Sequence, residues 1–417
     1  MSAGLQVRGP VAAMPTRRRT IAGLLGGTAA LLTGCTSTSS VFSNSSLFSS
    51  NPPPQANASP PPGTPATTIG TGQVKVGLIL PLSGGGNAGL AGQAMRNAAD
   101  MALAEFNSPN IQILVEDDAG DANTAATVAQ QALDQGATII LGPLFAQSVS
   151  AVGQVTRAHN IPVIAFSTDA NVAAPDVYLL SFLPETDVQR IVQYATSTGK
   201  RSYAALIPEN PYGSVVEASF RQEVARHGGQ IVALEHYPHD SAGMAGPVRT
   251  IAEAAARADA LFIPDGGDAV PGVVQMLVAG GVNTRRIQML GTGLWDDPRI
   301  FAAPALSGGW YAAPDAAGYR AFSGRYRRRF NQDPVRTATL AYDAVALVAA
   351  LVKTQPDPAQ RFSPQVLTNP SGFTGIDGLF RFLPNGTNQR GLAVLRVEPS
   401  GPRTISPPPR SFGASGI

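Results

Sequence analysis

The chain has 417 residues, with 30 basic and 28 acidic side chains and a single cysteine. This length is enough for two hydrophobic cores, and one cysteine excludes an internal disulfide, so burial of apolar side chains must hold the fold. The first 34 residues carry four arginines and no acid, and the rest of the chain has 26 basic and 28 acidic groups. This near-neutral remainder gives no argument for a nucleic-acid partner.

Residues 1–34 have the pattern of a secretory signal peptide. Three arginines at 17–19 precede an apolar run of 12 residues at 21–32, too short to cross a bilayer, which needs about 20 residues. The letters LTGC at 32–35 resemble the lipobox of bacterial lipoproteins, which implies cleavage before Cys35 and a lipid on its sulfur. An ordinary buried cysteine is the alternative. Met14 is an alternative start, and both Sec and twin-arginine export stay open.

Residues 35–73 are expected to form the lipidated end and a disordered tether. Residues 36–72 are almost all Ser, Thr, Pro, Asn, Gly and Ala and carry no charge, so they cannot bury enough apolar surface to fold. A coil of this length spans roughly 30–35 Å on average. Thr36 is not the aspartate that tends to retain lipoproteins at the inner membrane, which favours a periplasmic protein anchored to the outer membrane.

From residue 74 onwards, short apolar strands alternate with helices, a pattern that favours a parallel sheet in an α/β domain. Strands are expected at 74–80, 111–115, 138–141 and 162–165, and helices at 90–106, 124–133 and 148–158. The series restarts near residue 185, with strands at 203–207, 231–235, 260–263 and 287–290 and helices at 187–197, 215–226, 248–256 and 270–279. Two such units predict a two-lobed α/β protein with a cleft between the lobes.

The late part of the chain carries two further helical patterns. Phe322, Tyr326 and Phe330 recur every four residues and form a buried stripe, which turns the arginines between 325 and 329 toward water. Those arginines form either a solvated face or a contact for an anionic partner or membrane surface. The apolar segment 341–352, interrupted by Asp343, is expected to be a buried helix.

Several loops resemble the leucine/isoleucine/valine-binding family of periplasmic binding proteins, which has the type I fold. The likeness rests on VGLILPLSG at 76–84, EDD at 116–118, LGP at 141–143, IPVI at 161–164 with Ser167-Thr168, PYG at 211–213 and the late F…Y…F…P…AYDA series ending at 341–344. The resemblance implies three crossings between lobes. Lobe 1 would comprise 74–184 plus 309–375 and lobe 2 would comprise 185–308 plus 376–400, followed by a disordered tail at 401–417.

Ligands of open parallel sheets bind beyond the carboxyl ends of the strands, so polar residues in those loops are the candidate site. The expected ligand-binding residues are Ser83, Gly84, Gln147, Ser148, Ser167, Thr168, Asp169, Tyr212, Asp265 and Trp295. By resemblance, Ser167 and Thr168 would donate to a ligand carboxylate and Tyr212 would pack on the ligand.

Three of these assignments have a structural alternative. Asp169 would repel a ligand carboxylate and could instead cap the following turn. Asp265 could bind an ammonium group or cap a helix, and Trp295 could line the cleft or lie in the core. The glycine loop at 83–89 either presents N–H groups to an anionic or carbonyl group or is only mobile. The ammonium site of an amino-acid binder is therefore only partly present.

No cofactor, metal or catalytic residue is expected. The glycine loop has the outline of a dinucleotide fingerprint, but Pro81, Leu82 and Ser83 separate it from the strand. The acids at 116–118 and Asp121 lack an EF-hand's spacing, and His236 and His239 are too few for zinc. The motifs of serine hydrolases, zinc proteases and P-loop enzymes do not occur.

Two functions remain. The first is a lipid-anchored receptor that closes on a small polar ligand, an amino acid or amide-like solute, and delivers it to an ABC permease. The second is an outer-membrane lipoprotein activator of penicillin-binding proteins, which use a domain of the same fold to bind a peptidoglycan synthase. The first function is the one we expect, and the second is the alternative, for which the long uncharged tether, the incomplete ammonium site and Thr36 are arguments.

Overall fold

The structure is a computed structural model that describes residues 67–106 and 109–412. The predicted signal peptide, the lipidated Cys35 and the tether up to residue 66 lie outside the described residues, as does 413–417 of the predicted tail. Within the two described ranges, none of the helices has the length and hydropathy that crossing a membrane requires.

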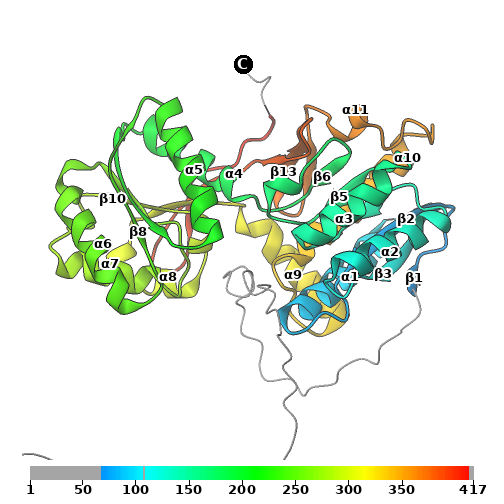
Figure 1. The fold of residues 1–417 in the computed structure, drawn as a ribbon, viewed down its shortest axis with the longest axis horizontal. Helices are drawn as coiled ribbons and strands as arrows, with labels where there is room; N and C mark the ends of the chain where they lie inside the picture. Colours follow the sequence, from blue (N-terminus) through cyan, green and yellow to red (C-terminus); the bar gives the residue numbers. More distant parts are fainter. Residues whose placement is uncertain (1–66, 107–108, 413–417) are drawn as a thin grey trace, which may run out of the picture. The chain divides into compact units, whose positions relative to one another are not determined.

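The first α/β unit is built on a six-stranded sheet, sheet A, with strand order β1-β3-β2-β4-β5-β6 (Figure 1). All neighbours are parallel except β1, which pairs antiparallel with β3. The strands are β1 (Thr67–Ile69), β2 (Val74–Leu80), β3 (Ile111–Asp117), β4 (Ile140–Leu141), β5 (Val163–Ala165) and β6 (Val177–Leu179). Their runs of Val, Ile and Leu are typical of parallel strands that are covered on both faces.

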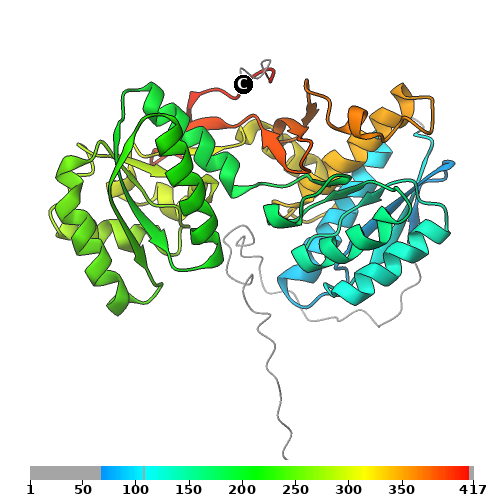
Figure 2. The ribbon, with the colours of Figure 1, turned by 45° about the horizontal axis from the view of Figure 1, so that its top comes forward.

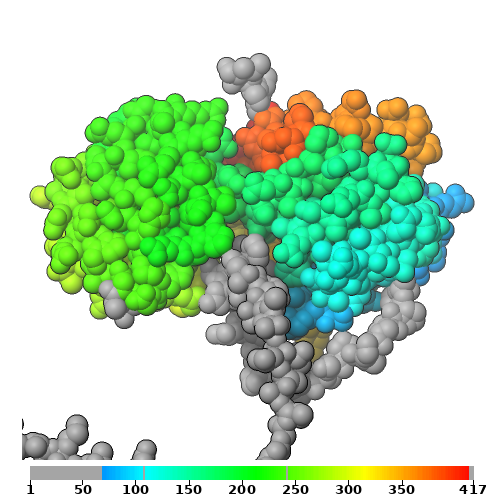
Figure 3. All heavy atoms as spheres, viewed as in Figure 1, coloured from blue at the N-terminus to red at the C-terminus, as the bar shows by residue number. Residues whose placement is uncertain are grey.

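Successive residues of β2 enter different cores because they point to opposite faces of the sheet. Leu78 packs with α1 (Asn87–Glu105) and α10 (Ala338–Thr354), and Ile79 packs with α2 (Ala122–Asp134) and α3 (Ala146–Arg157). α10 comes from much later in the sequence. Figure 3 shows this discontinuity, since orange residues of the later segment adjoin cyan residues of the first segment.

The second α/β unit is built on a seven-stranded sheet, sheet B, with strand order β16-β15-β11-β10-β9-β7-β8. β7 to β11 are parallel, and β15 and β16 are antiparallel additions. The strands are β7 (Ser202–Pro208), β8 (Gln230–Tyr237), β9 (Ala260–Phe262), β10 (Gln288–Gly291), β11 (Trp310–Ala313), β15 (Ala393–Arg396) and β16 (Arg403–Ser406). One face packs on α4 (Pro184–Ser197) and α5 (Pro211–Arg226), and the other on α6 (Ser241–Ala254) and α7 (Val270–Ala279).

A small antiparallel sheet, sheet C, joins the first unit. It consists of β12 (Phe373–Gly375), β13 (Gly378–Phe382) and β14 (Asn388–Arg390). Phe380 and Phe382 of β13 belong to the core that also contains Leu78. The remaining elements are α8 (Pro298–Phe301), α9 (Ala316–Phe330), α11 (Pro364–Leu367) and the 3₁₀ turns Ala170–Val172, Ala255–Arg257, Gly293–Trp295 and Pro304–Leu306.

The chain passes between the two units three times. The first crossing lies between β6 and α4, the second between β11 and α9, and the third between β14 and β15. These crossings can be followed in Figure 2. The predicted α/β class, with parallel-rich sheets flanked by helices, is confirmed.

Strand pairing places four segments differently from the expected boundaries. β11 was expected within lobe 1, but it pairs with β10 and β15 in sheet B. β13 and β14 were expected in lobe 2, but they form sheet C and pack in the first core. Arg403–Ser406 was expected to be disordered tail and pairs with β15, and Thr67–Ile69 was expected to be tether and pairs with β3.

The strands β1 and β16 share one physical reason for being missed. Each is too short to carry a periodic pattern of its own and becomes a strand only because a sheet edge offers hydrogen-bond partners. β1 illustrates this point, since the β-branched residues Thr67, Thr68 and Ile69 face Val115, Leu114 and Ile113 of the edge strand β3.

Candidate functional site

All ten expected ligand-binding residues follow the carboxyl end of a parallel strand. They follow β2, β4 and β5 in sheet A and β7, β9 and β10 in sheet B. Parallel strands end at the same edge of a sheet, so these residues form one group at the edge of each sheet. The sheet A group is Ser83, Gly84, Gln147, Ser148, Ser167, Thr168 and Asp169, and the sheet B group is Tyr212, Asp265 and Trp295.

The glycine loop after β2 is folded by its own hydrogen bonds. The backbone N–H of Ser83 donates to Asp117 Oδ1 at 3.2 Å, and that of Gly84 donates to the Pro81 carbonyl at 3.1 Å. Glycine is required at position 89, because a Cβ there would lie 2.3 Å from the Gly84 carbonyl oxygen. Ser83 and Asn87 are exposed, so the loop presents the Ser83 hydroxyl and the Asn87 amide to solvent.

The loop after β5 contains one engaged and one unengaged hydroxyl. Ser167 is buried, and its Oγ accepts from the Asp169 N–H at 3.1 Å. Asp169 Oδ1 accepts from the backbone and side-chain N–H groups of Asn171, each at 2.9 Å, so Asp169 caps the following turn. In the part of the chain that the structure describes, the half-buried Thr168 has no hydrogen-bond partner for its hydroxyl.

In the segment after β4, Gln147 and Ser148 have different surroundings. Gln147 is exposed, whereas Ser148 has no exposed surface and faces Asp118. Burial raises the pKa of the Asp118 carboxyl to about 6, although the Gly120 N–H donates to its Oδ1 at 3.0 Å. Ser148 therefore supports the end of β3 and is not positioned to meet a ligand, contrary to our expectation.

Tyr212 opens α5 directly after β7. Its phenol oxygen lies 2.8 Å from Thr292 Oγ1, so it is tied to the end of β10. Burial raises the pKa of Tyr212 well above its usual value, and the charges of Asp187, Asp265 and Glu185 raise it further. The phenol therefore stays protonated beside three carboxyl groups.

Asp265 after β9 receives three internal hydrogen bonds. Its Oδ2 accepts from the Tyr237 hydroxyl at 2.6 Å and from His239 Nε2 at 2.7 Å, and its Oδ1 accepts from the Gly266 N–H at 2.8 Å. The hydrogen bond to Asp265 raises the pKa of His239, whose side chain is 52% exposed. A carboxylate has about four lone-pair sites, so Asp265 keeps limited capacity for a ligand.

Trp295 lies in the core and not in a binding surface. Its side chain is fully buried among the apolar residues between sheet B and α7, and its Nε1 donates to the Ile263 carbonyl at 3.0 Å. The expectation that Trp295 binds ligand is therefore wrong. A short turn, Gly293–Trp295, bends the indole back under β10, which the sequence around it does not reveal.

Sequence reasoning missed two carboxyl groups at the start of α4, Glu185 and Asp187. Asp187 Oδ2 accepts from the Gly293 N–H at 2.8 Å, and burial raises the pKa of Asp187 to about 7. Burial also raises the pKa of Glu185, whose Oε2 is buried and lacks a partner among the described residues. Acidic residues are common in the first turn of a helix that begins with proline. The sequence pattern at Glu185 and Asp187 therefore did not indicate a binding site.

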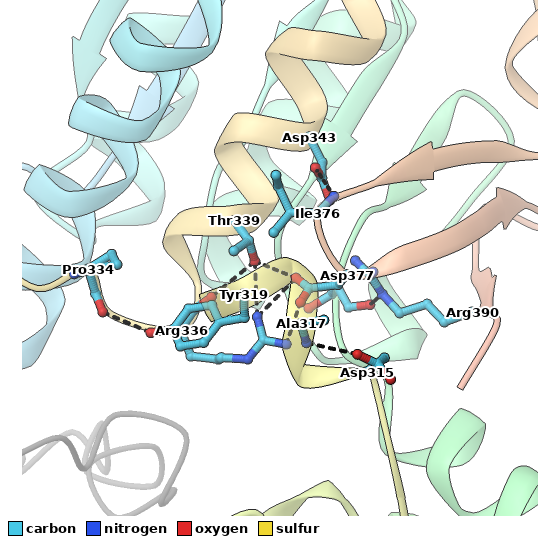
Figure 4. Close-up of polar contacts among 11 residues, drawn as sticks. Asp315, Ala317, Tyr319, Pro334, Arg336, Thr339, Asp343, Ile376, Asp377 and Arg390 are labelled. Atoms are coloured by element: carbon cyan, nitrogen blue, oxygen red, sulfur yellow. Dashed lines mark hydrogen bonds and ion pairs between the residues drawn. The ribbon is translucent and has the colours of Figure 1, made fainter. Parts of the chain in front are cut away.

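A buried charged cluster joins the ends of the crossings (Figure 4). Arg336 donates to Asp377 Oδ2 at 2.9 Å and Oδ1 at 2.5 Å, and the Thr339 hydroxyl donates to Asp377 Oδ2 at 2.6 Å. Burial opposes ionisation of Asp377, but Arg336 keeps its pKa below the usual value. Arg390 donates through Nε to the Ser181 carbonyl at 2.8 Å.

The same arginines belong to a stacked column of alternating rings and guanidinium groups. The Arg336 guanidinium carbon lies 4.5 Å from the Tyr319 ring centre and 4.6 Å from that of Phe182. The Arg390 guanidinium carbon lies 4.6 Å from the same Phe182 ring and 5.7 Å from Phe380. Phe182 is in the first crossing, Tyr319 follows the second and Arg390 precedes the third. This column of five side chains, the crossing column, therefore joins the first crossing to elements that flank the other two.

The arginines of α9 mainly bind their own protein. Arg325 pairs with Glu105 at 3.0 Å and Arg329 pairs with Asp100 at 2.8 Å, which fastens α9 to α1. The side chains of both Arg325 and Arg329 are thus engaged and do not present a free cationic surface. Across the described ranges, no group of three or more His, Cys, Asp or Glu residues could hold a metal ion.

Two α/β units, each with polar loops beyond the carboxyl ends of its parallel strands, place the candidate residues where ligands of open α/β sheets bind. The chain matches the family described as periplasmic binding protein over residues 73–402. It resembles a solved putative branched-chain amino acid ABC transporter protein from Rhodospirillum rubrum, with 20% identity, a TM-score of 0.71, and coverage of 80% of this chain and 99% of that chain. An ABC transporter substrate-binding protein from Sphaerobacter thermophilus gives 23% identity, a TM-score of 0.63, and coverage of 80% and 96%.

Among curated proteins, the chain is 29% identical over 129 residues to penicillin-binding protein activator LpoA of Pantoea ananatis. That match covers 31% of this chain and only 18% of the relative's length. Because the periplasmic binding protein match spans most of the chain, this protein belongs to the periplasmic binding protein family.

Proposed function

We propose that this protein is an extracytoplasmic solute-binding lipoprotein that captures an amino acid or amide-like solute for an ABC transporter, without catalysing a reaction. Membership of the periplasmic binding protein family supports this function. The anchor would be a lipid on Cys35, with the outer membrane favoured by Thr36.

The observation that carries the proposal is the different chemistry of the two strand-end groups. The sheet A group offers the hydroxyls of Ser83 and Thr168 and the amide of Gln147, and none of these carries a charge. In the second unit, the carboxyl groups of Asp187, Asp265 and Glu185 lie around Tyr212. Hydroxyls and amides suit a ligand carboxylate or carbonyl, and carboxyl groups suit an ammonium group. An amino acid carries both a carboxylate and an ammonium group.

The proposal implies closure of the two units on the ligand. A ligand stabilises the closed form only through contacts that the open form lacks. Groups on both sheets must therefore contribute, which is why both strand-end groups are included in the site.

A thermal-shift screen of the twenty amino acids and their amides tests the proposal, using the chain from residue 36 onwards. A ligand at 100 times its Kd adds about 2.7 kcal/mol of stability, which gives a clear rise in Tm. Thr168→Val removes an unengaged hydroxyl and should reduce the shift, whereas Thr250→Val on the exposed side of α6 should not. If no solute shifts the Tm, the solute-binding proposal fails.

A second function is favoured by a separate observation, the similarity to the LpoA activators. In that case the protein would bind a peptidoglycan synthase through this fold. Pull-down of a purified synthase by the full lipidated chain, combined with a negative solute screen, would support this alternative. Mass spectrometry of the membrane-extracted protein tests lipidation of Cys35 in both cases, and unmodified Cys35 would contradict it.

A further inference from the structure

The end of the described chain runs back from sheet B to sheet C. β16 is fixed in the second unit, because it pairs with β15 and Ile405 packs against the core beside α4. Arg190 of α4 also donates to Ser406 Oγ at 2.6 Å and to the Leu392 carbonyl at 2.9 Å. The last residue of β16 is therefore held firmly by the second unit.

Two of the six residues after β16, Pro409 and Phe412, contact the third crossing and the first unit. A Cβ on Gly391 would lie 3.2 Å from Pro409 Cγ, so the Pro409 ring rests on the third crossing. A Cβ on Gly372 would lie 2.9 Å from the Phe412 ring, and the Arg381 guanidinium carbon lies 4.6 Å from the centre of that ring. Gly372 directly precedes β12 of sheet C, and Arg381 lies in β13 of the same sheet. Figure 2 shows this red segment leaving sheet B beside the orange strands.

The composition of this segment makes it stiff. Residues 407–409 are three consecutive prolines, and proline fixes φ and favours the extended polyproline II conformation, with about 3.1 Å per residue. An extended segment that is anchored at both ends cannot lengthen much further. A flexible segment of the same length could follow a movement of its ends, but this one resists it.

We propose that residues 407–412, the C-terminal strap, form a fourth connection that restricts rotation of the second unit relative to the first. The three crossings are covalent links, and each of them is only a few residues long. The strap runs beside the third crossing, so two segments of the chain connect the units at that point. Its contacts with the third crossing through Pro409 and with sheet C through Phe412 are non-covalent, so the strap can be removed without cutting any of the three crossings.

The strap acts independently of any ligand, which makes it testable without knowing one. Ser150 on α3 and Gln222 on α5 are exposed and belong to different units. Cysteines at these two positions, in the full chain with Cys35→Ala, accept spin labels for a distance measurement by pulsed electron resonance. The variants are Phe412→Ala and a chain that ends after Ser406. The matched controls are Ser411→Ala, which alters an exposed side chain, and a chain that ends after Phe412.

We expect a broader distance distribution, or a second distance, in Phe412→Ala and in the chain ending at Ser406, and the parent distribution in both controls. Identical distributions in all five proteins would overturn the proposal.

Hydrogen exchange provides a second readout. The Gly391 N–H donates to the Leu379 carbonyl at 2.8 Å beneath the strap. Its exchange should become about two- to fivefold faster in Phe412→Ala, the size expected for the loss of one exposed cation–π contact. Amides of β2 in the sheet A core should keep their exchange rates. Unchanged exchange at Gly391, or equal acceleration in β2, would contradict a local strap.

Discussion

At the scale of single residues, Asp343 shows how burial controls a charge. It lies on α10 with 3% of its surface exposed, its Oδ1 accepts from the Ile376 N–H at 2.8 Å, and its Oδ2 has no partner within the described ranges. Burial raises the pKa of Asp343 to about 7, and the negative charge of Asp377 adds to the shift. Asp343 is thus a carboxyl group that the folded protein prefers to keep protonated.

This preference makes stability fall with rising pH. Between pH 4 and 7 the folded chain holds a proton on Asp343 that the unfolded chain releases, so each unit of pH costs up to about 1.4 kcal/mol from this group. Asp343→Asn removes the effect. The unfolding free energy of the variant, relative to the parent, should rise from pH 4 to 7 and then stay constant, as measured by urea denaturation.

The control for this titration is Asp333→Asn, since the Asp333 side chain is 68% exposed. Its stability relative to the parent should change little over the same pH range, because exposed ion pairs contribute only about 0–1 kcal/mol. A constant difference between Asp343→Asn and the parent from pH 4 to 8 would show that Asp343 is ionised throughout.

Position along the chain predicted where the candidate site residues lie, but not what each one contacts. A residue that follows a parallel strand reaches the carboxyl edge of its sheet, and this rule placed Tyr212 and Thr168 correctly at strand ends. Whether a side chain then points outward depends on the next two or three backbone angles. Trp295 turns into the core and Ser148 turns under the loop, and no periodic pattern encodes either rotation.

At the scale of elements, α9 approaches the turn between β12 and β13 at a glycine. A Cβ on Gly318 would lie 1.9 Å from the Ile376 carbonyl oxygen, so the helix must move away if any side chain is present. Gly318→Ala should lower the unfolding free energy by about 1–3 kcal/mol, the usual cost of overpacking. Urea denaturation at a fixed pH measures this change.

The same helix provides the matched control. A Cβ on Gly324 meets only the end of the Arg328 side chain, at 3.8 Å. Gly324→Ala should therefore stabilise the protein by about 0.5–1 kcal/mol, because alanine restricts the unfolded chain and favours the helix. Equal effects of the two substitutions would mean that α9 is not packed against that turn.

Elements with a long periodic pattern were predicted well from the sequence. The expected strand at 74–80 and helix at 270–279 coincide with β2 and α7. Short strands were missed, because β1, β11 and β16 span three or four residues and depend on neighbouring strands for their hydrogen bonds. α6 begins seven residues earlier than expected, and Pro247 lies inside the helix, a position that normally breaks or kinks a helix and so pointed to a start after it.

At the scale of the whole molecule, the crossing column places two cations over the ring of one phenylalanine. The guanidinium carbons of Arg336 and Arg390 each lie 4.6 Å from the ring centre of Phe182. The ring attracts both cations through its π-electrons. Because Phe182 belongs to the first crossing and Arg390 adjoins the third, this contact holds two crossings together on the side of sheet A.

Phe182→Leu tests this role, since it keeps most of the apolar volume but removes the π-electrons. Loss of two partly buried cation–π contacts should lower the unfolding free energy by about 2 kcal/mol and should broaden the distance between labels on α3 and α5. The control is Phe145→Leu, another half-buried ring of the same core, which stacks on no guanidinium group among the described residues.

Phe145→Leu should cost less, within the roughly 1.5 kcal/mol of a volume-conserving substitution, and should leave the distance distribution unchanged. If Phe182→Leu behaves like this control in both measurements, the ring acts only as a core side chain. If it broadens the distances without loss of stability, the crossings are held by the arginine hydrogen bonds alone, and Phe182 only limits the range of the rotation.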